Sequence, residues 1–138
     1  MPTFREAIEA RDMDAVDALL ADDVVFRSPV AFSPYPGKAI TSAILRAVTE
    51  VFENFVYVRE IADPGGDHAL VFEAEVDGLA ITGCDFLTYD EDGKIVDFMV
   101  MVRPLRAAEA LARAMGARFE QIQAQALAYG EDNSASTS

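Results

Sequence analysis

The stretch ALVFEAEVDGLAITGCDFLTY, residues 69–89, decides the fold of this chain. Apolar and polar side chains alternate on either side of Asp77-Gly78, a dipeptide typical of a tight hairpin turn. Leu70 and Phe72 fall on one face of the first half and Glu73 falls on the other, so the first face should point to the core. The stretch therefore predicts two antiparallel strands that share one buried face.

Two further strand patterns flank this hairpin. Residues 55–61 precede it through the turn Asp63-Pro64-Gly65-Gly66, and residues 95–102 follow it through Asp90-Glu91-Asp92-Gly93. Four successive strands joined by turns must be antiparallel, because a parallel connection needs a crossover of roughly a dozen residues or more. Both faces of the last strand are largely apolar, so we expect it to be covered on both sides.

Helical spacing dominates the chain before these strands. Residues 4–20 predict a helical hairpin with a polar break at Arg11-Asp12, where Asp12 suits the N-cap of the second helix. A short strand over residues 24–26 and a proline-rich loop over residues 28–37 follow it. Residues 40–52 then trace the apolar face of a third helix.

The end of the chain predicts an added helix and a tail. Pro104 ends the last strand and suits a first helical turn, and an apolar stripe from Leu105 to Ile122 predicts one long amphipathic helix. The sequence leaves open where this helix docks. The small polar residues from Gly130 onward are typical of disorder. We predict one domain over residues 1–128 and a disordered tail over residues 129–138.

Composition restricts the partners and the compartment. The net charge of −13 repels phosphate backbones and anionic lipids, so neither nucleic acid nor a membrane is an expected partner. No apolar run approaches the ~18 residues that a membrane span needs. The lone Cys84 excludes an intramolecular disulfide and no signal peptide opens the chain, so we expect a cytoplasmic protein. With His68 the only histidine, we expect no metal or nucleotide cofactor.

Asp85 is a carboxylate within an apolar strand. Alternation places Gly83 and Leu87 on its face. If that face lines a cavity, the loss of hydration raises the carboxyl pKa and suits Asp85 to proton transfer or to binding a ligand carbonyl. The alternative is a carboxylate satisfied by backbone amides or an arginine, or one exposed at an edge. Gly83 leaves room beside Asp85, which favours the cavity.

The other polar candidates have weaker patterns. Tyr57 and Tyr35 could donate hydroxyls to the same ligand, or serve only as aromatic wall. His68 opens a strand just after a turn, which favours a surface position. Ser28 has no histidine partner in the sequence that would make it a nucleophile. Cys84 falls on the face opposite Asp85 and is interpreted as a small buried hydrophobe.

The order of these elements resembles the nuclear transport factor 2 fold, an α+β cone in which a curved antiparallel sheet packs on three N-terminal helices around a cavity. The run Ala21-Asp22-Asp23-Val24-Val25-Phe26, followed by Ser28-Pro29, resembles a motif of ketosteroid isomerases and SnoaL-like polyketide cyclases. Asp92-Gly93-Lys94-Ile95-Val96 is similar to their DGKI strand entry. The resemblance covers about residues 3 to 103 and leaves the last helix as an addition.

The resemblance carries over one of three isomerase site positions. The catalytic-base aspartate of the isomerases falls on Ser28, and by ungapped counting their oxyanion-hole tyrosine falls on Phe4; neither residue can perform the role. Their protonated aspartic acid falls on Asp85, and this position is kept. In SnoaL-like cyclases a single pocket aspartate acts as acid/base, and the resemblance implies that role for Asp85.

Together these observations predict an apolar cavity that binds a small, oxygenated hydrophobic molecule. If the protein is an enzyme, we expect metal-free proton transfer of the isomerase or cyclase type through Asp85. The alternative is a non-catalytic small-molecule-binding or dimerisation module. We also expect a homodimer formed through the sheet. The predicted ligand-binding residues are Phe26, Tyr35, Tyr57, Leu70, Phe72, Leu87, Phe98 and Val100.

Overall fold

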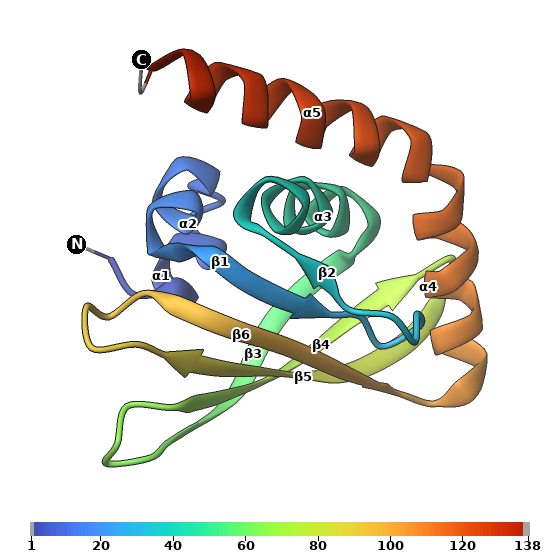
Figure 1. The fold of residues 1–138 in the computed structure, drawn as a ribbon. Coiled ribbons are helices and arrows are strands. Elements are labelled where there is room, and N and C mark those ends of the chain that lie inside the picture. The colour runs from blue at the N-terminus through green and yellow to red at the C-terminus, as the bar shows by residue number, and fades with distance from the viewer. Residues whose placement is uncertain (1, 137–138) are drawn as a thin grey trace.

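A curved, mostly antiparallel sheet carries the fold, with helices over one of its faces (Figure 1). The computed structural model describes the backbone of residues 2–136 and the side chains of residues 2–129. Within these residues the helices and strands are α1 (Phe4–Glu9), α2 (Met13–Leu19), β1 (Leu20–Arg27), β2 (Tyr35–Pro36), α3 (Lys38–Val51), β3 (Glu53–Ala62), β4 (His68–Val76), β5 (Leu79–Tyr89), β6 (Ile95–Arg103), α4 (Leu105–Ala117) and α5 (Phe119–Ser136). The α+β cone predicted from the sequence is confirmed.

The strand order is β2-β1-β6-β5-β4-β3. The strands β3 to β6 form the predicted antiparallel meander. The sequence did not predict that β1 would lie parallel to β6, with Phe26 opposite Phe98, or that β2 would add an edge strand. This pairing joins segments far apart in the chain, so no local pattern could reveal it.

The inner face of the sheet is the one that alternation predicted. Leu70 and Phe72 on β4 are almost fully buried, whereas Glu73, which follows Phe72 and points to the other face, is exposed. In the ladder between β4 and β5, Leu70 lies opposite Asp85 and Phe72 lies opposite Gly83. Asp85 therefore belongs to the buried face of the sheet.

Polar contacts hold the helices α1 to α3 over this face. The side chain of Asp12 accepts a hydrogen bond from the backbone N–H of Ala15 and caps α2, as predicted. On the buried side of α2, the carboxylate of Asp17 accepts hydrogen bonds from the Ser42 hydroxyl at 2.6 Å and from the Arg46 guanidinium at 2.7 Å. These bonds fix α2 against α3, and each carboxylate oxygen of Asp17 has a hydrogen-bond donor.

The outer face of the sheet carries large apolar side chains that are open to solvent. Met101 on β6 is 54% exposed, and Phe86 on β5 and Val56 and Val58 on the edge strand β3 are also exposed. The sequence predicted cover on both sides of β6, but no element of the described part of the chain lies over this outer patch. The cover that such a surface favours would have to come from another molecule.

The single long helix predicted from Leu105 to Ile122 is wrong: the structure has two helices that meet at Arg118. The backbone N–H of Arg118 donates to the carbonyl of Met115, and the turn follows Gly116, a residue type that favours helix poorly. The turn lets α5 cross α3 and bury Ile122, and the Arg118 guanidinium bonds Glu50 on α3 at 2.6 Å. An unbroken apolar stripe could not reveal this turn.

The backbone of α5 is helical through Ser136, beyond residue 129, where the sequence predicted a tail to begin. A helical path does not test order in solution, so the domain end at residue 128 and the disordered tail over 129–138 stay predictions; residues 137 and 138 lie outside the described residues. Among the described helices, none combines the length and the apolar character needed to cross a bilayer.

Candidate functional site

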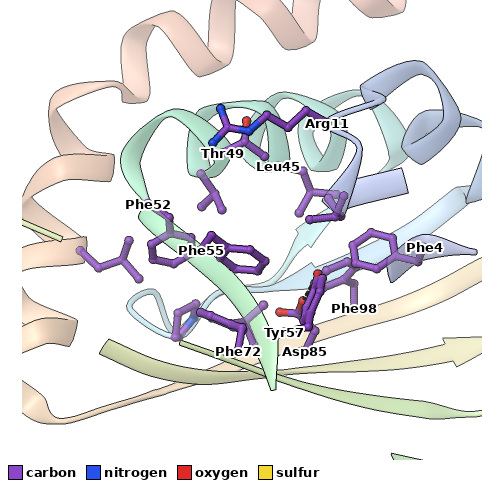
Figure 2. A pocket seen from close by; sticks show the side chains of 15 residues that line it. Phe4, Arg11, Leu45, Thr49, Phe52, Phe55, Tyr57, Phe72, Asp85 and Phe98 are labelled. Carbon is purple, nitrogen blue, oxygen red and sulfur yellow. Dashed lines mark hydrogen bonds between the residues drawn. The ribbon is translucent and has the colours of Figure 1, made fainter. Parts of the chain in front are cut away.

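A cavity of about 80 Å³ lies between the inner face of the sheet and the helices above it (Figure 2). This is several times the ~10–15 Å³ that one buried water needs. The polar members of its wall are Arg11, Thr49, Tyr57 and Asp85. The rest of the wall is apolar and consists of Phe4, Ile8, Pro29, Leu45, Val48, Phe52, Phe55, Phe72, Phe98, Val100 and Leu111.

Asp85 stands in the sheet side of this wall, with 7% of its surface exposed. Among the described residues its side chain has one hydrogen-bond partner, the Tyr57 hydroxyl, which donates to Oδ2 at 3.3 Å. Burial raises the pKa of the Asp85 carboxyl to about 7, although the bond from Tyr57 acts in the opposite direction. Near neutral pH this carboxyl can therefore both accept and release a proton.

Tyr57 reaches the same place from β3. Its side chain is 4% exposed, and burial together with the nearby charge of Asp85 holds the pKa of its phenol well above the usual value. The hydroxyl therefore stays protonated and acts as a hydrogen-bond donor. At 3.3 Å its bond to Asp85 is longer than the usual ~2.7–2.8 Å between two oxygens, so an oxygen of a ligand can compete for the same proton.

Aromatic rings enclose this pair of groups. Phe55 meets the Tyr57 ring edge-on at 4.9 Å and stacks on Phe72 at 5.0 Å. A Cβ atom at Gly83 would lie 2.3 Å from the Phe72 ring, so a side chain at this position would force the ring to shift. The sequence predicted that Gly83 leaves room near Asp85, and in the structure the Phe72 ring occupies that room.

The structure brings five of the predicted site residues together: Tyr57, Phe72, Asp85, Phe98 and Val100 all line the cavity. Their alternation along the four adjacent strands β3 to β6 explains this outcome, because each points to the inner face of the sheet.

The other predicted ligand-binding residues lie elsewhere. Phe26 and Tyr35 line a second cavity of about 170 Å³ bounded by the proline-rich loop, α3, α4 and α5. Phe26 lies beside Phe98 at a ring distance of 5.4 Å, but on the side away from Asp85, because β1 pairs with the far edge of β6. Leu70 and Leu87 are buried in the core and line neither cavity.

The two positions that the family resemblance matched to the isomerase tyrosine and base, Phe4 and Ser28, lie in different cavities. Phe4 lines the cavity of Asp85, with its ring 5.2 Å from that of Phe98, whereas Ser28 lines the second cavity. Cys84 faces away from Asp85, as alternation predicted, and burial raises the pKa of its thiol. The His68 ring packs on Tyr89 at 5.3 Å, outside the lining of either cavity.

Sequence reasoning missed several wall residues. Phe55 could have been found, because it lies two residues before Tyr57 on the same strand face. Phe52 and Leu111 required knowledge of how α3 and α4 dock. Arg11 was interpreted only as part of a polar break between helices, and nothing local indicates that its side chain borders a cavity.

The described residues contain no group of three or more His, Cys, Asp and Glu side chains placed to hold a metal ion. The arrangement is instead an acid-bearing apolar cavity closed by helices over a curved sheet, which defines the nuclear transport factor 2-like class of α+β proteins. Within this class, the chain belongs to the SnoaL-like domain family, whose model matches residues 3–98.

Solved structures agree with this assignment. A steroid delta-isomerase from Pseudomonas aeruginosa is 43% identical over 86% of this chain and 87% of its own, with a TM-score of 0.80. A protein with a cystatin-like fold from Silicibacter pomeroyi is 36% identical over 93% and 89% of the two chains, with a TM-score of 0.83.

A protein from Shewanella denitrificans that is named as a SnoaL-like polyketide cyclase shares the fold at 15% identity. The match covers 83% of this chain and 92% of that one, with a TM-score of 0.59. No curated protein matches this chain significantly.

Proposed function

We propose that the protein binds a small, oxygenated hydrophobic molecule in the cavity of Asp85 and moves a proton on it without a metal or a nucleotide. The observation that carries this proposal is a buried carboxyl, with its pKa raised to about 7, facing an apolar cavity beside a protonated tyrosine. A carboxyl with a pKa near the working pH is efficient in both directions of proton transfer.

The chemistry would begin when a ligand carbonyl accepts the hydrogen bond of Tyr57. That exchange removes the bond that lowers the pKa of Asp85 and makes its carboxylate a stronger base. Asp85 then takes a proton from the carbon next to the carbonyl, and Tyr57 stabilises the oxygen of the resulting enolate. For an isomerisation, the carboxylic acid of Asp85 returns the same proton to another carbon of the conjugated system. For a cyclisation, the enolate carbon bonds to a second carbonyl carbon of the ligand, and Asp85 gives the proton to the resulting alkoxide oxygen.

The relatives support a reaction of this type. The Pseudomonas protein is named for isomerising a steroid, and the Shewanella protein is named as a cyclase of polyketides. Both names describe oxygenated and largely apolar ligands. By the resemblance of the two sequences, Phe4 and Ser28 fall at the positions of the isomerases' tyrosine and base, so we assign the donor to Tyr57 and the base to Asp85.

The test is exchange of the α-protons of 2-acetylnaphthalene in D₂O, followed by proton NMR with wild type, Asp85→Asn and Tyr57→Phe. Wild type should accelerate the exchange, Asp85→Asn should abolish the acceleration, and Tyr57→Phe should reduce it by about 10²-fold, as for loss of one enolate donor. The control is Asp23→Asn, which removes an exposed carboxylate of β1.

A non-catalytic binding function is the second candidate. It is supported by Phe4 and Ser28, which the resemblance matches to two of the three isomerase site positions but which cannot perform those roles. A non-catalytic binding protein would bind 2-acetylnaphthalene without accelerating exchange. That result, or unchanged exchange in Asp85→Asn, would contradict the catalytic role of Asp85.

We also propose that two copies of the chain associate through the outer face of the sheet. Met101, Val56, Val58 and Phe86 are exposed apolar side chains of this face, and burying them is favourable. Wild type should sediment as a dimer, and Met101→Glu should sediment as a monomer with an unchanged circular dichroism spectrum. A monomeric wild type would contradict this proposal. The cytoplasmic location stays a prediction.

A further inference from the structure

Arg11 holds a fixed backbone position at the edge of the Asp85 cavity. It occupies the link between α1 and α2 in a left-handed conformation, with φ of 55°. Its own N–H donates to the carbonyl of Ile8 at 3.0 Å, and the N–H of Asp12 donates to the carbonyl of Ala7 at 2.9 Å. Because the side chain of Asp12 also caps α2, the link is hydrogen-bonded to both helices, and the Cα and Cβ atoms of Arg11 have a fixed position.

Among the residues that the structure describes, the charge of Arg11 has no partner. Arg5, Arg46 and Arg118 each form ion pairs with glutamate or aspartate. The guanidinium of Arg11 forms no hydrogen bond or ion pair with any described residue. In a chain with 24 acidic residues and a net charge of −13, an unpaired arginine beside an apolar cavity is available to a ligand.

The polar groups of the cavity lie at two opposite ends. Figure 2 shows Arg11 and Thr49 at the α3 side, whereas Tyr57 and Asp85 lie at the sheet side. Phenyl rings and aliphatic side chains form the wall between the two ends. Arg11 is exposed to solvent as well as bordering the cavity, so it marks the mouth, and Asp85 marks the floor.

We propose that Arg11 selects ligands with a carboxylate at the end opposite the carbonyl that meets Tyr57 and Asp85. This inference rests on the proposed function and adds the class of substrate: an aromatic or alicyclic keto acid with an apolar middle. A guanidinium binds a carboxylate through two parallel hydrogen bonds, which orients the ligand with its carbonyl toward the floor. A neutral analogue of the same shape would enter the cavity without being oriented by Arg11.

The experiment compares the binding of three probes by calorimetry: 6-acetyl-2-naphthoate, its methyl ester and 2-acetylnaphthalene. Wild type should bind the carboxylate about five- to tenfold more tightly than the ester, and added salt should reduce this preference. Arg11→Asn should remove the preference without weakening ester binding, and Arg11→Lys should keep part of it. Asparagine suits the left-handed backbone at this position, so the fold is preserved.

The matched control is Arg106→Gln, which removes an exposed arginine of α4 that does not line the cavity and forms no ion pair with another described residue. It should keep the full preference for the carboxylate. The role of Arg11 would be overturned if wild type bound the carboxylate and the ester with equal affinity. It would also be overturned if Arg106→Gln lost as much of the preference for the carboxylate as Arg11→Asn. Either result would leave the proposed function intact. Failure of all three probes to bind would overturn both.

Discussion

Replacing Asp85 by asparagine should make the folded protein more stable than wild type at alkaline pH. The carboxyl has a pKa of about 7 in the folded protein, against an ordinary value of 3.8. The folded state therefore binds this proton more tightly than the unfolded state. The free energy of unfolding of wild type must therefore fall as the pH rises from 3.8 to about 7. Above about pH 7 the ionisation of Asp85 causes no further loss of stability.

The size of the effect follows from the two pKa values. At about 1.4 kcal/mol for each pKa unit, ionising Asp85 inside the fold costs on the order of 4 kcal/mol once the pH exceeds 7. Roughly 3 kcal/mol of this cost develops between about pH 5 and about pH 7. That is a large part of the ~5–15 kcal/mol that stabilises a typical domain. Asparagine has nearly the shape of the neutral acid and never ionises.

The assay is urea unfolding followed by circular dichroism for wild type and Asp85→Asn at about pH 5 and about pH 8. The advantage of the variant should grow by roughly 3 kcal/mol between the two conditions. Asp23→Asn, on the exposed side of β1, should give no such pH dependence. An advantage that is equal at both pH values, or a variant less stable than wild type at the higher pH, would refute a buried carboxyl of raised pKa.

Three further substitutions test the surroundings of this carboxyl and of the helices. Tyr57→Phe removes the hydrogen bond that lowers the pKa of Asp85, so the carboxyl should titrate above 7 by carbon-13 NMR; a lower value would contradict the assigned bond. Gly83→Ala places a methyl group against the Phe72 ring and should destabilise the fold by about 1–3 kcal/mol in urea unfolding, whereas Ala80→Gly on the exposed part of β5 should not exceed about 1 kcal/mol. Ser42→Ala removes a 2.6 Å bond to the buried carboxylate of α2 and should cost about 1–3 kcal/mol, and a neutral result would show that this bond does not stabilise the helix pair.

Much of the fold is predictable because it depends on local chemistry. The hairpin at Asp77-Gly78 and the meander follow from turn residues and period-two alternation, and the cap at Asp12 follows from its side chain. The parallel pairing of β1 with β6 and the turn at Arg118 were not predictable in this way. Each is decided by contacts with segments distant in sequence, which no local pattern records.

The floor of the cavity was more predictable than its mouth. Asp85 and Tyr57 lie on strands whose alternation fixes the direction of each side chain. Phe26 and Tyr35 were assigned to the same cavity but line another, because the position of β1 and β2 in the sheet decides which side they face. Arg11 lies in a link between helices, where direction depends on the docking of both helices rather than on a repeating pattern.

The most direct test of the account is the ionisation of Asp85 itself, measured by carbon-13 NMR of the side-chain carboxyl groups across the pH range. The Asp85→Asn variant identifies the resonance by its absence. The account predicts that this carboxyl titrates at about 7 and that binding of 2-acetylnaphthalene changes its titration, because the ligand takes the Tyr57 hydrogen bond. Titration near the ordinary value of 3.8, unaffected by the ketone, would contradict the assignment of Asp85 as the acid/base group of this cavity.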